Sequence, residues 1–444
     1  MPPGRSHDPA SELAEVLGHQ KKGRPRALYA ACTANGFAIQ AVLRRARQDG
    51  TPALVESTAG QVNLSGGYSG LTPDLFRRQV LQMAAGMGVA PGQVILGGDH
   101  IGPHLWRRMP AGQAMQKAAA LTAACVAAGY RKIHLDPVSP CGDDPLLADG
   151  SLPLELVCRR TAELGRVAEQ AAEKAKISPP VYVIGSDVPP PGGEIGAAGP
   201  PSVTDPGRLR DFLSACRRAF ESMELMPAWE RVYAVVVHTG AAFSPLMVQP
   251  YSSDRLKPLT ALISRDKSRV LEAHSTDFQT EEDLAAMVKD HCGVLKVGPA
   301  LTYALREALF ALAEMERRTL GARKDVTCSR LPEVMERLMV AEPGFWQTYY
   351  QGSEGEQAHL RQHALSDRIR YYWARPEAEA ARQQLFANLR RYPPPLSVVR
   401  ECLPAAGDKI GTGRLDNDPG AIVLDRIGQV TKTYARACRL DRTV

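Results

Sequence analysis

The chain has 444 residues, 44% of them hydrophobic and 23% charged, and a formal net charge of +6. This hydrophobic fraction is typical of a globular protein with a sizeable core, and the small, dispersed charge excludes a strongly basic nucleic-acid-binding surface. No apolar run reaches the roughly 20 residues that cross a bilayer, so we also expect no membrane partner.

Residues 1–26 form a polar N-terminal segment, with charged side chains where a secretory signal would have an apolar core. The nine cysteines of the chain are odd in number and include no CxxC pair, which predicts neither a disulfide framework nor a zinc knuckle. Both observations favour a reducing compartment, so we expect a cytoplasmic protein.

Eight short runs of apolar and β-branched residues follow, and each precedes a longer segment with helical spacing. Hydrophobicity is nearly continuous within the runs, as in parallel strands that are buried on both faces. Thr72 and Thr280 are placed to cap two of the intervening helices. The expected strands are residues 27–34, 53–58, 93–99, 132–136, 181–187, 232–238, 268–274 and 293–297.

Eight strand–helix repeats predict a closed (β/α)₈ TIM barrel over residues 27–320. An open nucleotide-binding sheet would also alternate strands and helices, but no GxGxxG follows the first strand. Residues 321–444 have helical composition, and we expect a helical C-terminal extension rather than a second catalytic domain. Within it, residues 365–373 mix arginines with aromatic side chains, which we interpret as an amphipathic packing face rather than a ligand site.

Polar or ionisable side chains follow nearly every expected strand. In a TIM barrel the C-terminal ends of the strands converge on one face, where catalytic groups lie. Burial alone does not require polar groups at so many strand ends, so their repetition predicts an active site. They include Asn35, Glu56, Asp99, His100, Asp136, Asp187, His238, His274, Asp277 and Lys296, and Gly298 follows the eighth strand.

Three of these side chains, His100, His238 and His274, end the third, sixth and seventh strands. Three imidazoles at one barrel mouth can bind a divalent cation (Zn²⁺, Mn²⁺, Co²⁺, Ni²⁺ or Mg²⁺) and leave a position for substrate oxygens. Asp99, beside His100, is then a natural general acid/base. A hydrogen-bonded structural role is the alternative for any single histidine, but three together favour a metal site.

Glu56 and Asp136 end the second and fourth strands and are further catalytic candidates. They either act as an acid/base, orient ligand histidines or bind sugar hydroxyls, or they cap loop amides and helix N-termini. Glu194 lies in a Pro- and Gly-rich loop, residues 188–194, which is expected over the barrel mouth as either a lid or a rigid crossover.

The eighth strand leads through Lys296 and Gly298 into a helix near Pro299. Loops after strands seven and eight often bind phosphate in barrels, through backbone N–H groups and the helix dipole. We therefore expect Lys296 and Gly298 to bind an anionic part of the substrate, unless Lys296 is an interior lysine paired with a carboxylate. The other expected substrate-binding residues are Asn35, His104, Asp187, Glu194 and Asp277.

Several motifs occur in order along residues 20–440. They include Leu-Gly-Gly-Asp-His at 96–100, Lys-Ile-His-Leu-Asp at 132–136, Glu-Ala-His-Ser-Thr-Asp at 272–277 and Ser-Asp-Arg-Ile-Arg-Tyr-Tyr-Trp at 366–373. Together they resemble the GatZ/KbaZ family of tagatose-bisphosphate aldolase subunits. That family is similar to class II metal-dependent aldolases, whose Asp-His pair after the third strand supplies an acid/base and a metal ligand.

The resemblance places those two roles on Asp99 and His100, and the later ligands on His238 and His274. Family members are either metal-dependent 4-epimerases of ketose 6-phosphates or non-catalytic subunits that stabilise a separate aldolase. The family pattern has no histidine at position 238, so this imidazole either completes a three-histidine site or shifts the substrate preference.

These features predict a metal-dependent 4-epimerase that interconverts tagatose and fructose, or their 6-phosphates, by retro-aldol cleavage and re-addition. The alternatives are a non-catalytic subunit of a tagatose-1,6-bisphosphate aldolase, or the aldolase itself. Expected partners are the sugar or sugar phosphate, with a homo-oligomer or an aldolase partner subunit. A kinase is not expected, because the sequence has no GxxxxGK[ST] phosphate-binding loop.

Overall fold

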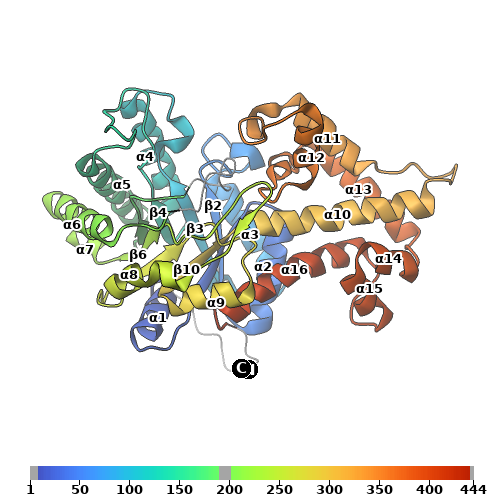
Figure 1. Cartoon of the computed structure of the whole chain (residues 1–444), viewed down its shortest axis with the longest axis horizontal. Helices are drawn as coiled ribbons and strands as arrows, with labels where there is room; N and C mark the ends of the chain where they lie inside the picture. The colour runs from blue at the N-terminus through green and yellow to red at the C-terminus, as the bar shows by residue number, and fades with distance from the viewer. Residues whose placement is uncertain (1–8, 190–201, 441–444) are drawn as a thin grey trace.

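Eight parallel strands close into a barrel, as the sequence predicts (Figure 1). The computed structural model describes residues 9–189 and 202–440. Around the barrel the strands follow the order β1-β10-β9-β6-β5-β4-β3-β2. They are β1 (Leu28–Cys32), β2 (Ala53–Thr58), β3 (Val94–Ile101), β4 (Lys132–Leu135), β5 (Val181–Ile184), β6 (Val232–Val237), β9 (Val270–Ala273) and β10 (Cys292–Val297). Every expected strand segment therefore overlaps one barrel strand.

Helices cover the outside of the barrel, and a small antiparallel ribbon follows β6. The ribbon consists of β7 (Ala242–Phe243) and β8 (Val248–Gln249). The helices are α1 (Pro9–Lys21), α2 (Gly36–Asp49), α3 (Pro73–Gly86), α4 (Ala111–Ala127), α5 (Leu154–Ala175), α6 (Pro206–Ser222), α7 (Met226–Trp229), α8 (Ser253–Ile263), α9 (Glu281–Lys289) and α10 (Pro299–Leu320). None of the helices in the described part of the chain combines the length and the apolar character needed to cross a membrane.

Both predicted helix caps are confirmed. The Thr72 side chain accepts a hydrogen bond from the Leu75 amide at the start of α3, and Pro73 occupies the first turn, where no N–H is needed. The Thr280 side chain accepts from the Asp283 amide at the start of α9. These local signals fix where each helix leaves the barrel rim.

The chain after α10 forms a helical extension beside the barrel, on the right of Figure 1. Its helices are α11 (Leu331–Ala341), α12 (Glu354–His363), α13 (Pro376–Arg391), α14 (Leu396–Cys402), α15 (Pro404–Gly411) and α16 (Pro419–Ala437). α16 packs against α10, α2 and α9. The Tyr434 hydroxyl donates to the Thr276 carbonyl oxygen at 2.8 Å, which ties the extension to the loop after β9.

Residues 365–373 do not form the amphipathic helix that the sequence suggested. They contain a 3₁₀ turn, η5 (Arg368–Tyr372), which contacts another 3₁₀ turn, η1 (Gly67–Ser69), in the loop after β2. The three remaining 3₁₀ turns are η2 (Pro91–Gln93), η3 (Pro103–Trp106) and η4 (Pro343–Phe345). The turn η5 thus lies beside the barrel mouth, and it also packs against α10, α11 and α12.

The interior of the barrel contains charged side chains where branched apolar residues are usual. Glu56, Lys132 and Glu272 project into it from β2, β4 and β9, and each is 0% exposed. The Lys132 ammonium nitrogen lies 2.7 Å from one carboxylate oxygen of Glu56 and 2.7 Å from one of Glu272. This ion-paired layer lies directly below the strand ends.

Gly97 makes room for that layer, because a β-carbon at position 97 would lie 2.6 Å from the Glu56 γ-carbon. We expect Gly97→Ala to lower the free energy of unfolding by about 1–3 kcal/mol, as overpacking does in a tight core. Gly428→Ala in α16, where a β-carbon meets nothing within 4 Å, is the control and should stabilise by about 0.5–1 kcal/mol. Denaturant unfolding of both variants measures the effect, and an unchanged Gly97→Ala would contradict this account.

Candidate active site

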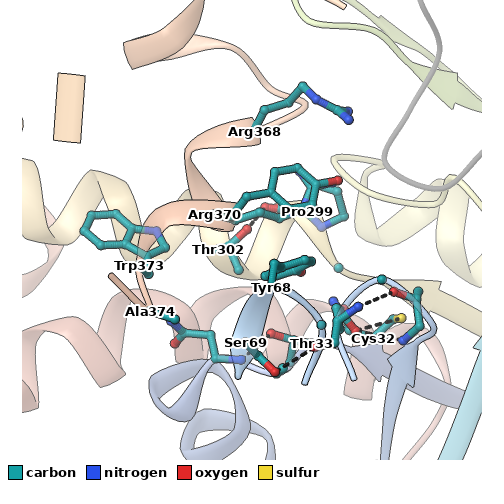
Figure 2. A pocket seen from close by; sticks show the side chains of 18 of the residues that line it. Cys32, Thr33, Tyr68, Ser69, Pro299, Thr302, Arg368, Arg370, Trp373 and Ala374 are labelled. Atoms are coloured by element: carbon teal, nitrogen blue, oxygen red, sulfur yellow. Dashed lines mark hydrogen bonds between the residues drawn. The ribbon is translucent and has the colours of Figure 1, made fainter. Parts of the chain in front are cut away.

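A cavity of about 980 Å³ opens at the C-terminal ends of the barrel strands (Figure 2). Its walls come from the strand-end loops and from the region around η5 in the C-terminal extension. Eight of the residues predicted from sequence line it: Asn35, Asp99, His100, His104, His274, Asp277, Lys296 and Gly298. The polar strand ends therefore converge on one space.

The other predicted residues lie elsewhere. Glu56 is buried in the charged layer, and Asp136 is buried with its carboxylate against His100, so neither lines the cavity. Asp187 and His238 follow β5 and β6, are partly exposed, and do not line it either. Glu194 lies outside the described residues.

Three imidazoles cluster at the strand ends, but His134 takes the place that the sequence suggested for His238. The ring centroids of His100 and His134 are 5.1 Å apart, those of His100 and His274 5.1 Å, and those of His134 and His274 5.4 Å. His134 is 0% exposed. Among the described residues, His238 belongs to neither group of donor atoms spaced to hold a metal ion.

Carboxylates orient the imidazoles. His100 Nδ1 lies 2.7 Å from an oxygen of Asp136, which leaves its Nε2 to face Asp99 at 3.8 Å. His274 Nε2 lies 3.0 Å from an oxygen of Glu272. Such carboxylate–histidine pairs fix ring orientation and raise the basicity of a metal-binding histidine.

His134 is the least satisfied of the three. Its Nδ1 lies 3.1 Å from an Asp99 oxygen, while its buried Nε2 has no hydrogen-bond partner. A buried polar atom without a partner costs about 1–3 kcal/mol, so its retention needs an explanation. A bound cation would provide one, since a ring nitrogen is a good ligand for Zn²⁺, Co²⁺ or Ni²⁺.

The backbone at the end of β3 is irregular where the Asp-His pair lies. The register between β3 and β4 shifts between Gly98 and Ile101, and His100 has a left-handed φ of +48°. A non-glycine residue in this conformation costs about 1–2 kcal/mol. Bulges of this kind redirect side chains near active sites, and this one aims Asp99 and His100 into the cavity.

The cluster carries an excess of negative charge. Burial acts to raise the pKa of Asp99, but His100, Lys296 and His134 together hold it well below its usual range, and Lys132 and Lys296 likewise depress the pKa of Glu272. Hydrogen bonding to His100 lowers the pKa of Asp136 to about 2 against the effect of burial. With Glu56, these four carboxylates face two ammonium groups and the His100 imidazole, whose pKa Asp99 and Asp136 raise against the effect of burial, so negative groups still outnumber positive ones.

The donor atoms are also spaced for a cation. Atoms of Asp99, His134, Glu272 and His274 lie within 4.8 Å of one another, and so do atoms of His100, His134 and Asp136. Burial lowers the pKa of His274 to about 4, so its ring is neutral and able to coordinate near pH 7. The residues present therefore fit a divalent metal ion.

Comparison with known proteins identifies the family of this chain. A family model for D-tagatose-1,6-bisphosphate aldolase subunit GatZ/KbaZ-like proteins matches residues 13–439. The chain belongs to the GatZ/KbaZ-like family.

A crystal structure of a probable tagatose 6-phosphate kinase from Sinorhizobium meliloti 1021 is 35% identical to this GatZ/KbaZ-like protein. The match covers 93% of this chain and 100% of that one, with a TM-score of 0.83. Two more distant matches are the fructose-bisphosphate aldolase of Campylobacter jejuni and the YdjI aldolase of Escherichia coli K12. They are 14% and 11% identical, cover 89% and 87% of this chain and 94% and 97% of theirs, and have TM-scores of 0.45 and 0.40.

Sequence reasoning missed His134, Lys132 and Glu272, although a signal for them was present. Side chains alternate along a strand, so Lys132 and His134 share the inward face with Asp136, and Glu272 shares it with His274. His134 and Glu272 lie two residues before Asp136 and His274, and Lys132 lies four residues before Asp136, so the inward faces of these strands contain all three.

A metal-binding comparison of His134→Ala with His238→Ala separates the two histidine sets of this GatZ/KbaZ-like protein. We expect His134→Ala to weaken Zn²⁺ or Co²⁺ binding by roughly 10- to 100-fold, as loss of a ligand or of its support does, and His238→Ala to leave it unchanged. Metal content after dialysis and competition with a chelating dye measure both. A larger loss of metal affinity in His238→Ala than in His134→Ala would instead support the trio predicted from sequence, His100, His238 and His274.

Proposed function

We propose that this protein is a metal-dependent 4-epimerase that interconverts tagatose and fructose, or their 6-phosphates. The observation that carries the proposal is the complete constellation on the cavity floor: an ionised Asp99 between His100 and Lys296, with further imidazoles and carboxylates around it. A protein that only supports a partner has no need of an ionised carboxylate, strained backbone and paired histidines in one buried place.

His134 would hold the metal ion together with His274 and Glu272 or with His100 and Asp136, since the donor atoms of each set lie within 4.8 Å of one another. When bound there, a divalent cation supplies Lewis acidity for oxygens of the substrate. The protein itself supplies orientation, because each carboxylate fixes one imidazole ring. Lys296 lies 3.0 Å from an Asp99 oxygen and, together with His100, holds the pKa of that carboxylate well below its usual range.

The reaction begins with proton transfer to Asp99, whose carboxylate accepts the proton of the C4 hydroxyl group. The C3–C4 bond then breaks: C4 becomes an aldehyde carbon, and the bonding electrons pass to C3 and into the C2 carbonyl. Rotation of the aldehyde fragment and renewed C3–C4 bond formation on its other face invert C4. Asp99 returns its proton to the new alkoxide, so no atom is gained or lost.

Direct proton abstraction at C4 is the less favourable route, because that hydrogen is not adjacent to the C2 carbonyl and the resulting carbanion has no electron sink. Bond cleavage between C3 and C4 avoids this difficulty. It also links the proposal to the aldolase relationship of the family.

The second candidate is a non-catalytic subunit of a tagatose-1,6-bisphosphate aldolase, and the description of the family favours it directly. An aldolase that releases its trioses is the third. Both alternatives have the same cavity as the proposed epimerase. They differ from it in whether products are released from the cavity, and in which products these are.

The deciding experiment incubates purified, metal-reconstituted protein with fructose 6-phosphate or fructose and follows the products by NMR. The C4 epimer should appear, and a chelator or His100→Ala should abolish it. Accumulation of trioses would instead identify an aldolase. If no divalent metal supports turnover, the subunit role replaces this proposal, and an aldolase that co-purifies becomes its evidence.

A further inference from the structure

One wall of the cavity is not used by the proposed chemistry. It consists of the arginines and aromatic rings around η5, in the C-terminal extension of the chain. Tyr371 stacks on Phe345 with 4.8 Å between ring centroids and 7° between planes, and it meets Tyr68 edge-on at 4.6 Å. This rigid aromatic support holds Arg368 and Arg370 in place.

Neither arginine has a carboxylate partner among the described ion pairs. Arg368 donates to the Phe345 carbonyl oxygen and lies over the Tyr349 ring at 3.2 Å, while its Nη1 is buried with no partner at all. Its side chain lines the cavity although the residue is only 4% exposed. A fixed cationic donor without a partner indicates that a ligand acceptor is missing.

Among the described residues, the hydrogen bonds of Arg370 go to neutral groups, while the charge of Asp367 also acts on its guanidinium. It donates to the backbone carbonyl oxygens of Ser366 and Asp367 and, at 2.9 Å, to the Tyr371 hydroxyl. Figure 2 shows it beside Pro299 and Thr302, with Tyr68 below and Arg368 farther out. By contrast, two other arginines on the cavity wall are neutralised, Arg375 by Glu342 and Arg382 by Glu379.

The wall has a positive potential. Burial acts to raise the pKa of Tyr371, but the charges of Arg370 and Arg368 outweigh it and lower that pKa below its ordinary value. A corner that stabilises a phenolate will also stabilise another anion.

The site predicted for an anion at the start of α10 is already in use. One oxygen of Asp277 accepts hydrogen bonds from the amides of Gly298, at 3.0 Å, and Ala300, at 2.8 Å. These amides would otherwise offer a phosphate site. An anion placed there would meet the Asp277 carboxyl group.

We propose that Arg370 and Arg368 bind the terminal phosphoryl group of the substrate. The proposal rests on the proposed function and names its substrate as a ketohexose 6-phosphate. The guanidinium fork matches phosphate oxygens, and the reacting carbons then extend toward Asp99 across the same cavity. The unphosphorylated sugar lacks the group that this wall binds.

Arg370→Gln tests the assignment, with Arg382→Gln as the matched control on the same cavity wall. Inorganic phosphate is the probe for binding, measured by titration calorimetry on the full chain. We expect Arg370→Gln to weaken its affinity about 30-fold, as loss of a charged hydrogen-bonding partner does. In the NMR assay, the ratio of kcat/KM for fructose 6-phosphate to that for fructose should fall by a similar factor, and Arg370→Lys should recover part of it.

Circular dichroism checks that each variant is folded. If Arg370→Gln does not fold, the same measurements are made on Arg368→Gln. Unchanged phosphate affinity in the folded arginine variant, or an equal loss in Arg382→Gln, would overturn the subsite. Weaker phosphate binding confined to the Arg370 variant would support it even if no sugar turns over. In that case the epimerase proposal is wrong, while the assignment of an anion-binding site to Arg370 is supported.

Discussion

Asp99→Asn is expected to lower kcat for C4 epimerisation by roughly 100- to 10,000-fold, the range that general acid–base catalysis contributes. The amide keeps the size of the side chain and can still accept hydrogen bonds from His134 and Lys296. It cannot take the C4 hydroxyl proton. NMR detection of the epimer, together with metal analysis of the same sample, measures turnover and metal content separately.

Asp99→Glu is the companion variant, because it keeps the carboxylate and moves it by one methylene. It should retain more turnover than Asp99→Asn. Full activity in Asp99→Asn would remove this residue from the scheme. Loss of the metal along with activity would instead make Asp99 a metal ligand.

Lys132→Met should produce the largest change in stability. Its ammonium group is the shared partner of Glu56 and Glu272, all three being 0% exposed. Methionine has a similar length but leaves Glu56 and Glu272 to share the Lys296 ammonium group, one cation for two carboxylates. Removing one member of a buried ionic group costs about 3–5 kcal/mol, and we expect that loss in the free energy of unfolding.

Denaturant unfolding measures this loss, and two further variants define its origin. Lys289→Met, at an exposed position in the last turn of α9, should change stability by less than about 0.5 kcal/mol. Lys132→Met combined with Glu272→Gln should recover part of the loss, because one unpaired charge is removed with it. If the double variant is no more stable than the single one, lost packing rather than unpaired charge explains the effect.

The barrel was predictable because its signals are local. Nearly continuous apolar runs recur eight times, caps such as Thr72 and Thr280 mark the start of two helices, and each strand can be recognised without knowing its neighbours. The end of β3 was less predictable: the strand continues to Ile101, two residues beyond the expected end, because a register shift lets it pass the Asp-His pair.

The candidate site was only partly predictable, for two physical reasons. His134 projects from inside β4, so it belongs to the cavity through strand alternation and not through a strand-end position. The wall around Arg370 depends on a contact between η5 and the loop after β2. Nothing in the composition of residues 365–373 encodes that contact, and the same residues would suit a packing face.

The origin of the cavity walls has a consequence for how such a protein diverges. The floor, with Asp99 and His274, is built from strands that the whole barrel must keep in register. The wall around Arg370 is formed by the turn η5 of the C-terminal extension, which is supported by stacked aromatic rings. The candidate acid/base and the proposed phosphate-binding arginines therefore lie on different parts of the chain. Under the proposed assignment, exchange of that one turn between relatives would change which sugar is accepted and leave the chemistry untouched.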